Sequence, residues 1–436
     1  METRNRSLTT RFVAFISSIF GVVMFFGGVS QGYAQRIKSA APQRQPIVLQ
    51  GATIHVGNGN VINNGSVRFE KGIITEVGTK VNTTGAEVMN LAGKHIYPGV
   101  IAPNTSVGLV EIGAVRASVD YSEQGRFNPE ARSLTSFNTD SDIIPTLRYT
   151  GVLIAESVPS GGVVSGTASL MEMDGWNWED AVHKADHGIH MNWVARFGRS
   201  GRPNRNRARS LKIIENIMNE ARAYVQNPKP AKINLKFEAM RGLFNGTTTL
   251  FVHANYSKDI VESVQKLKAH GVKKIVIVGA EGALKVARFL KDENVPVILS
   301  NTHRLPQRSH IDVDLPFKLP YLLKKSGVLT GLYVGGSWQV RTLPFQAGTA
   351  AAHGLTKEEA LQMITLNNAK ILGIDKTVGS IEQGKHATLL VSKGDILDML
   401  TNDIEQAFIR GKKVILDDKQ QQLYKRFQKK YNGQKK

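Results

Sequence analysis

Between residues 47 and 99 the apolar positions fall in short runs that alternate with polar ones. The runs IVLQGATIHVG, SVRFEKGIITEVG and AEVMNLAGKHIYPG are rich in valine and isoleucine and are divided by glycine and asparagine. That pattern is typical of β-strands joined by tight turns. It returns only near the other end, in SIEQGKHATLLVSKGDI and EQAFIRGKKVIL. Each block is too small to close a core alone, so we expect residues 47–97 and 377–416 to pack together as one composite β-sandwich.

The long segment between these blocks, residues 98–376, has a different pattern. Helical segments such as KDIVESVQKLKAHG and EGALKVARFLKDEN, in which apolar residues recur every three or four positions, lie between apolar strand-like runs. This alternation favours a parallel sheet with crossover helices. We therefore predict an α/β fold in which a (β/α)8 TIM-type barrel is inserted into the bipartite sandwich. An open doubly wound sheet is the alternative. The strand-like runs are residues 150–156, 247–254, 273–280, 295–300 and 329–336.

Two glycines near the ends of the chain predict hairpin turns. Gly72 follows a lysine in the Glu-Lys-Gly step, and Gly411 follows Arg410 in the C-terminal block. Tight two-residue hairpins need backbone with positive φ, which glycine adopts without a steric cost. We expect one strand pair to turn at each position.

The first 34 residues predict export. Basic residues precede an apolar run from Phe12 to Val29, and Gly32, Tyr33 and Ala34 follow it. That order is typical of a secretory signal peptide, with cleavage after Ala34. The apolar run is close to membrane-spanning length, so a retained anchor is the alternative. We expect the mature chain to be exported, periplasmic or secreted, and to contain no membrane span after cleavage.

The chain is basic and contains no cysteine. It has 56 lysines and arginines against 36 acidic residues, a formal net charge of +20. Residues 1–34 carry three arginines and one glutamate, so the rest keeps +18. Without cysteine, disulfides, thiolate nucleophiles and cysteine-based zinc sites are excluded. Much of the charge lies in residues 196–212 and in a basic C-terminal tail, residues 417–436. No nucleic-acid-binding motif accompanies either patch, so both are interpreted as solvated surface, with an anionic polymer as the alternative partner.

Residues 354–391 carry the most specific pattern in the chain. The string GLTKEEALQMITLNNAKILGIDKTVGSIEQGKHATLLV opens with a capping box, Thr356 and Glu359, which predicts the start of a helix. As a whole it closely resembles the C-terminal signature of amidohydrolases of the imidazolonepropionase-like group. The resemblance covers residues 47–416. Further matches are Leu343-Pro344 and Ala347-Gly348 after the last barrel strand, and Tyr97-Pro98-Gly99 between sandwich and barrel.

Members of this metal-dependent group hydrolyse C–N bonds, typically in amides and cyclic amides. The resemblance implies one or two divalent ions that activate a bound water, with an aspartate as the base. Its ligands come from strand ends: a His-x-His pair on the first barrel strand, a histidine on the fifth, often one on the sixth, and an aspartate on the eighth. If the site is active, zinc or another divalent metal is the implied cofactor, and a small-molecule amide or cyclic amide is the implied substrate.

This sequence departs from that ligand pattern at most positions. The two histidines of the first strand correspond to Asn104 and Ser106, and only His253, on the fifth, is retained. A single imidazole cannot hold a catalytic ion, because catalytic zinc sites use three protein ligands. The other ligands are missing too: the sixth strand ends in Gly279-Ala280-Glu281, and no carboxylate lies between Val328 and Phe345.

Four residues remain as candidates for the site. His253 is the catalytic candidate, either as the only retained metal ligand position or as a general base. Asn104, Ser106 and Asn255 are candidates for substrate binding. A lone histidine at the end of a core strand is also commonly a hydrogen-bonded structural residue, so that alternative stays open for His253.

A further histidine array lies outside the expected strand ends. His183, His187 and His190 follow Trp176 and Trp178 with the spacing HxxxHxxH, which resembles helical spacing. Histidine arrays can bind metal ions. Because this one lies away from the carboxyl ends of the predicted strands, we interpret it as structural.

Three functional hypotheses follow. The first is a hydrolase for non-peptide C–N bonds that uses an unusual site. The second is a degenerate or weakly active member, a pseudoenzyme candidate. It would be a non-catalytic binding or assembly subunit of the cell envelope, as a homo-oligomer or a hetero-oligomer with an active paralogue. The third is an envelope protein whose basic patches bind anionic polymers. The missing His-x-His pair and aspartate favour the second hypothesis over the first. Nucleic acid is not expected as a partner.

Overall fold

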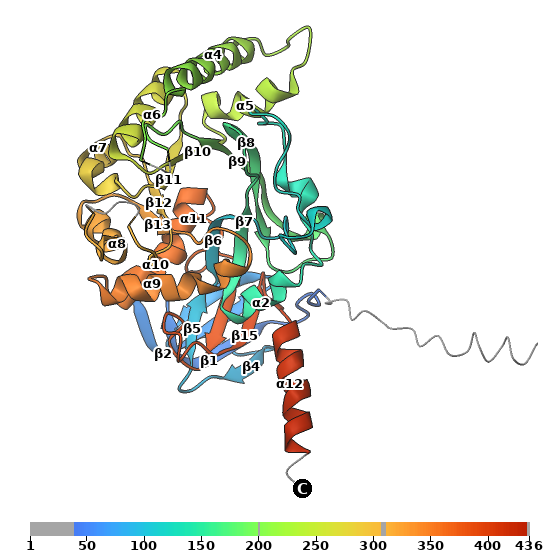
Figure 1. Ribbon diagram of the computed structural model, residues 1–436. Helices are drawn as coiled ribbons and strands as arrows, with labels where there is room; N and C mark the ends of the chain where they lie inside the picture. Colours follow the sequence, from blue (N-terminus) through green and yellow to red (C-terminus); the bar gives the residue numbers. More distant parts are fainter. Residues whose placement is uncertain (1–38, 199–200, 307–310, 434–436) are drawn as a thin grey trace, which may run out of the picture. The chain divides into compact units, whose positions relative to one another are not determined.

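The computed structural model describes residues 39–198, 201–306 and 311–433, and the predicted signal segment lies outside them (Figure 1). From Ser39 onward the chain forms one compact unit. Its strands make two sheets of eight strands each. In this part of the chain we find no helix with both the length and the apolar character that a membrane span requires.

The first sheet is built from both ends of the chain. Its order is β16-β15-β14-β5-β1-β2-β3, and β4 pairs with β1 outside this path. β14 runs antiparallel to β5, with Leu389 opposite Pro98, so this pairing joins the two β-rich blocks. The strands are β1 (Ile47–His55), β2 (Val61–Glu70), β3 (Ile73–Gly78), β4 (Glu87–Asn90), β5 (His95–Pro98), β14 (Leu389–Ser392), β15 (Ile404–Ile409) and β16 (Lys412–Lys413).

Both predicted hairpin turns are confirmed, and they pack against each other. Lys71 and Gly72 have φ of 50° and 80°, and Arg410 and Gly411 have 45° and 72°. A Cβ on Gly72 would lie 2.8 Å from the carbonyl oxygen of Arg410, and one on Gly411 would lie 3.0 Å from Gly72 Cα. Glycine is therefore required at residue 72 for two reasons, the positive φ and the close approach of the second turn.

The second sheet forms the barrel, in the order β13-β12-β11-β10-β9-β8-β7-β6. Its strands are almost wholly buried; every residue of β7 and β11 is buried, as expected for strands covered on both faces. The predicted α/β fold, a TIM-like barrel with an additional β domain, is confirmed. The strands are β6 (Val100–Thr105), β7 (Val152–Ser157), β8 (Val164–Glu172), β9 (Val182–Asn192), β10 (Thr249–Ala254), β11 (Ile275–Gly279), β12 (Val297–Leu299) and β13 (Thr330–Leu332).

One barrel strand departs from the expected strict (β/α)8 alternation. β8 runs antiparallel to both of its neighbours, β7 and β9, whereas the other pairings in this sheet are parallel. Only residues 158–163 separate β7 from β8, and Gly161 and Gly162 lie there with positive φ. A parallel connection needs a dozen or more residues, so this short turn can only join antiparallel strands.

Helices cover the outside of the barrel, and in Figure 1 α4, α6, α7 and α8 lie along the outer side of the later strands. The predicted capping box starts α10: Thr356 Oγ1 accepts a hydrogen bond from Glu359 N, and the Glu359 carboxylate accepts one from Thr356 N. The helices are α2 (Ile143–Tyr149), α3 (Trp178–Ala181), α4 (Arg207–Gln226), α5 (Leu235–Asn245), α6 (Ser257–Ala269), α7 (Ala287–Asp292), α8 (Leu315–Lys325), α9 (Leu343–Ala352), α10 (Lys357–Ile364), α11 (Leu366–Leu372) and α12 (Lys419–Asn432).

Candidate functional site

The carboxyl ends of the parallel barrel strands open onto a cavity of about 630 Å³. This is the end of a β/α barrel at which active sites are found, because the strand ends and the loops after them meet there. The cavity is large enough for a small organic molecule. Its polar lining comes mainly from the ends of β9, β10 and β13, in the residues Asn192, His253, Asn255, Asp259 and Tyr333.

A chain of hydrogen bonds leads from the barrel interior to this cavity. Glu156 on β7 is fully buried, and its Oε1 lies 3.2 Å from His190 Nε2 on β9. His190 Nδ1 lies 3.0 Å from Nε2 of His253 on β10. His253 lines the cavity, so it is the outer member of the chain Glu156–His190–His253.

Two further groups hold the Glu156 carboxylate. His187 Nε2 lies 2.9 Å from Oε1 as an ion-pair contact, and the backbone N–H of Asn104 donates to Oε2 over 2.8 Å. Burial alone would raise the pKa of Glu156. The charge of His190 and the hydrogen bonds from His187 and His190 outweigh burial and bring that pKa well below its ordinary value. Glu156 is therefore an ionised carboxylate inside the barrel.

The protonation of His190 decides which nitrogen of His253 carries a proton. When His190 is neutral and donates from Nε2 to Glu156, its Nδ1 accepts from His253 Nε2–H, so His253 Nδ1 keeps a free lone pair. When His190 is protonated, it donates from Nδ1, and His253 then carries its proton on Nδ1. Burial, with the charge of His190, lowers the pKa of His253 to about 3 against the attraction of Glu156. His253 is thus neutral at physiological pH.

Asn104 and Ser106 lie at the end of the first barrel strand. Asn104 has a φ of 52°, a left-handed conformation that asparagine tolerates better than most residues. Its side chain forms a hydrogen bond with the Tyr333 hydroxyl. The N–H of Ser106 donates to the carbonyl of Gly336 over 2.9 Å, which ties the end of β6 to the loop after β13. Asn104 is thereby fixed between Glu156 and Tyr333.

Asn255 lines two neighbouring cavities at the carboxyl end of the barrel. One is the cavity that His253 lines, and the other is a groove of about 280 Å³ that Phe197 and Tyr256 also line. A Cβ on Gly279 would lie 2.5 Å from Asn255 Oδ1, so only glycine allows this side chain its place. Three of the four predicted site residues therefore lie at the cavity or at the hydrogen-bond chain: His253 and Asn255 line the cavity, and Asn104 donates to Glu156. Ser106 lies on the loop after β6, which is hydrogen-bonded to the loop after β13.

The described residues do not fit the divalent ion that the resemblance implies. His253 is the imidazole at the mouth, and its Nε2 is bonded to His190. At the end of β11 the carboxylate of Glu281 pairs with Arg304 Nη1 at 2.9 Å. Beyond β13 the residue is Tyr333, whose hydroxyl is kept neutral because burial raises its pKa. Among the residues that the structure describes, no set of three convergent ligands results at this end of the barrel, so we derive no step through a metal ion.

The histidine array is on a strand and not on a helix, which corrects the interpretation from spacing. Along β9 the register against β8 shifts between Gly188 and Lys184, and Asp186 in between has a φ of 48°. This bulge re-aims the side chains, so both His187 and His190 lie inside the barrel against the Phe251 ring, at centroid distances of 5.6 and 4.7 Å.

His183, the first member of the array, lies at the other end of β9. Its Nδ1 is 2.9 Å from Glu172 Oε1, and Arg410 Nε donates to the same oxygen over 2.6 Å. Glu172, His183 and His386 have ligand atoms within 4.8 Å of one another, the one such trio among the residues that the structure describes. Because Arg410, a permanent cation, occupies the carboxylate, we interpret this cluster as a polar bridge between the barrel and the first sheet.

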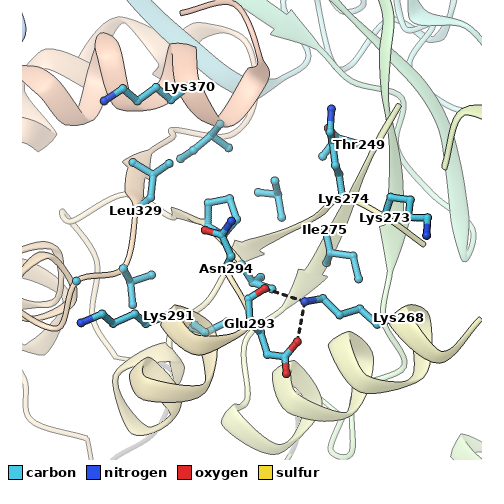
Figure 2. A pocket seen from close by; sticks show the side chains of 17 residues that line it. Thr249, Lys268, Lys273, Lys274, Ile275, Lys291, Glu293, Asn294, Leu329 and Lys370 are labelled. Atoms are coloured by element: carbon cyan, nitrogen blue, oxygen red, sulfur yellow. Dashed lines mark hydrogen bonds and ion pairs between the residues drawn. The ribbon is translucent and has the colours of Figure 1, made fainter. Parts of the chain in front are cut away.

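A second cavity, of about 400 Å³, lies at the amino ends of the barrel strands (Figure 2). Its floor is apolar, and Figure 2 shows lysine side chains around its rim. One acidic residue, Glu293, lines it, and Lys268 Nζ donates to both its carbonyl and its carboxylate over 2.7 Å. Since catalysis in β/α barrels takes place at the opposite end, we do not assign the reaction here. The lysines are Lys268, Lys273, Lys274, Lys291 and Lys370.

Sequence reasoning missed two central residues, Glu156 and His190. The signal for Glu156 was present, because one carboxylate within the apolar run TGVLIAES cannot avoid burial without interrupting the strand. His190 was noticed but placed on a helix. Its place opposite Phe251 in the pairing of β9 with β10 is set by tertiary structure, which the spacing of histidines does not show.

Comparisons with known proteins agree with the fold and with the motif. A sequence model of the amidohydrolase family matches residues 218–414. An imidazolonepropionase from Clostridium tetani is 24% identical over 377 residues, which cover 77% of this chain and 86% of that protein. The crystal structure of an amidohydrolase from Thermotoga maritima superposes with a TM-score of 0.77 at 24% identity, over 85% of this chain and 99% of that one.

A more distant structure shares the fold. An adenosine deaminase from Xanthomonas campestris, solved with bound zinc, has a TM-score of 0.53 at 14% identity, over 89% of this chain and 98% of that one. The family model, the sequence relative and the barrel with its additional sheet all indicate similarity to amidohydrolases. Together they support the amidohydrolase superfamily as the family that this chain resembles.

Proposed function

We propose that this protein is a hydrolase-type amidohydrolase for non-peptide C–N bonds of small molecules that has lost most of its metal-binding capacity, so that hydrolysis is weak or absent. The observation that carries this proposal is the bond between His190 Nδ1 and His253 Nε2. The one retained imidazole is hydrogen-bonded within the protein. The expected first-strand ligand positions hold Asn104 and Ser106, and no carboxylate lies between Val328 and Phe345. Without an ion to activate water, the largest contribution to the rate is missing.

Any remaining hydrolysis would pass through His253. In the tautomer with a free Nδ1 lone pair, His253 can accept a proton from a water in the cavity, while His190 and Glu156 stabilise the imidazolium that forms. A base with a pKa of about 3 is a poor proton acceptor at neutral pH. The chain Glu156–His190–His253 therefore supports slow general-base catalysis at most, and the cavity fits a small-molecule amide or cyclic amide.

The test is an assay of the purified mature chain against a panel of lactams, hydantoins and N-acyl amines at neutral pH. We expect turnover close to background for each class. Any residual turnover should disappear in His253→Ala and remain in His270→Ala, a histidine at the end of α6, away from the cavity. Fast hydrolysis that survives His253→Ala would refute this assignment of the site.

The alternative is a non-catalytic binding or assembly subunit of the cell envelope that acts beside an active paralogue. It is favoured by Asn104 and Ser106, which stand where the family's His-x-His pair is expected. Co-purification of the exported protein with a paralogue that keeps the His-x-His pair would support this reading. The same cavity would then bind a small amide without turnover.

We also propose that residues 1–34 direct export and are removed, so that the mature chain is periplasmic or secreted. Within it, residues 47–97 with 377–416 would form the composite β domain and residues 98–376 the barrel domain, followed by the basic tail 417–436. The support is the basic, apolar and small-residue order of the first segment and the pairing of β5 with β14.

A further inference from the structure

The last helix, α12, is attached to the rest of the chain at its amino end. Asp418 caps it by accepting a hydrogen bond from Gln421 N over 2.7 Å. Its first turn contacts α2 and the residue before it, through Gln420 with Thr146 at 3.1 Å and Lys419 with Asp142 at 3.9 Å. No residue of α12 is buried, and Figure 1 shows the helix, in red, extending away from the sheets.

The exposed side chains of α12 include an apolar stripe. Leu423, Tyr424, Phe427 and Tyr431 are 40, 62, 47 and 59% exposed. At 3.6 residues per turn these four positions fall within an arc of about 100°, the width of a helix face that normally packs on something. Large apolar side chains gathered on one exposed face mark an interaction surface.

The remaining surface of α12 is basic. Five residues of the helix are lysine or arginine, and Lys419–Asn432 contains no acidic residue. Lys430 borders the stripe, with its Nζ 5.5 Å from the centre of the Tyr431 ring. The basic residues are Lys419, Lys425, Arg426, Lys429 and Lys430.

The basic residues of α12 indicate which kind of partner can cover its apolar face. A second copy of α12 would bring five cations against five cations, which is unfavourable. A soluble polyanion would satisfy the lysines and leave the apolar face in water. The surface of an anionic bilayer offers both parts, phosphate headgroups for the basic residues and the acyl boundary for the leucine and the aromatic rings.

We propose that α12 docks the protein on an anionic lipid bilayer, with Leu423, Tyr424, Phe427 and Tyr431 inserted at the headgroup boundary. The helix lies in the plane of the surface and does not span it, because 14 residues extend only about 21 Å. Aromatic rings beside lysines suit this depth, since they combine an apolar body with a polar tip. The proposal is independent of whether the barrel catalyses a reaction.

The test is co-sedimentation of the full mature chain with two kinds of vesicle, pure phosphatidylcholine and phosphatidylcholine mixed with phosphatidylglycerol. We expect binding to the mixed vesicles alone. Lys425→Gln/Lys429→Gln should weaken it roughly 25-fold at low salt, since each basic residue near an anionic surface contributes about fivefold. Leu423→Ser/Phe427→Ser should also reduce the bound fraction at least tenfold, because the apolar anchor is lost.

Matched controls lie elsewhere on the surface. Lys229→Gln/Lys232→Gln removes two exposed charges, and Met399→Ser/Leu400→Ser removes two side chains that are 66 and 94% exposed. Both should bind as the parent does. Circular dichroism of each α12 variant checks that the protein remains folded, as expected for substitutions at positions that are not buried.

Three results would overturn the proposal. The first is equal sedimentation with both kinds of vesicle, or with neither. The second is vesicle binding that Leu423→Ser/Phe427→Ser leaves unchanged and heparin abolishes, which would mean charge attraction alone. The third is concentration-dependent self-association in analytical ultracentrifugation that the same double variant removes, which would show that a second copy covers the stripe.

Discussion

His190 Nδ1 lies 3.0 Å from His253 Nε2, and on its other side His190 Nε2 lies 3.2 Å from the buried carboxylate of Glu156. His253, the one residue retained from the expected ligand pattern, is the outer end of a protein hydrogen-bond chain. Because His253 Nε2 is hydrogen-bonded to His190, this nitrogen is not free to bind a metal ion, which supports the proposed loss of metal binding.

The first prediction concerns Glu156. Replacing it by glutamine removes the charge that two imidazoles and the Asn104 N–H surround. Removing one charged partner from a buried ion pair destabilises a protein by about 3–5 kcal/mol. Glu156→Gln should therefore lower the free energy of unfolding by about that amount. Urea denaturation measures it. Glu220→Gln, at an exposed position on α4, should change stability by less than about 0.5 kcal/mol.

The second prediction concerns pH. The pKa of His253 is about 3 in the folded chain, below the ordinary 6.5, so between these values the unfolded chain binds the extra proton. Its contribution to stability is fully present above pH 6.5 and is lost as pH falls toward 3. The lowered pKa of Glu156 acts in the same direction, below the ordinary value for glutamate of 4.5.

Urea denaturation at several pH values between 4 and 6.5 tests this contribution. The parent should lose stability more steeply than His253→Gln, with a difference of about 1 kcal/mol per pH unit for one proton. Parallel curves for the two proteins would mean that His253 titrates near its ordinary pKa, and the burial argument would be wrong.

The third prediction concerns the paired hairpin turns. Gly72→Ala forces a Cβ to within 2.8 Å of the Arg410 carbonyl oxygen and places alanine at a φ of 80°. We expect a loss of about 2–3 kcal/mol in the free energy of unfolding. Gly85→Ala has a similar positive φ of 68° but no atom within 4 Å of the added Cβ, so it should lose only about 1 kcal/mol. Equal losses would show that the contact between the turns is unimportant.

The fourth prediction is that restoring the first-strand histidines does not restore a metal site. In Asn104→His/Ser106→His, His253 Nε2 stays bonded to His190, and no carboxylate is available at the end of β13. Isothermal titration with zinc should show no stoichiometric tight binding in the double variant. A new site of 1:1 stoichiometry would show that the missing aspartate is dispensable.

Much of the fold could be predicted from the sequence, because apolar periodicity is local. The return of short Val- and Ile-rich runs at both ends anticipated the pairing of β5 with β14, and the Thr356–Glu359 box anticipated the start of α10. The antiparallel strand β8 was not anticipated. The apolar pattern of β8 is the same for a parallel and an antiparallel strand. Only the short connection, residues 158–163, distinguishes these two orientations.

The candidate site was harder to predict, since its groups meet through tertiary structure. His253 could be assigned by its place after an apolar strand. Glu156 and His190 are separated by 34 positions, and their contact depends on β8 lying between their strands. Spacing within β9 suggested a helix because a bulge breaks the two-residue period of a strand.

The most direct test of the central claim is the metal content of the purified mature protein after extensive dialysis without chelator, measured by inductively coupled plasma mass spectrometry. Our account predicts far less than one equivalent of zinc, manganese, iron or nickel per chain. It also predicts no change in thermal unfolding when EDTA is added. One or more equivalents of a divalent metal that survives dialysis and is lost in His253→Ala but kept in His270→Ala would contradict it.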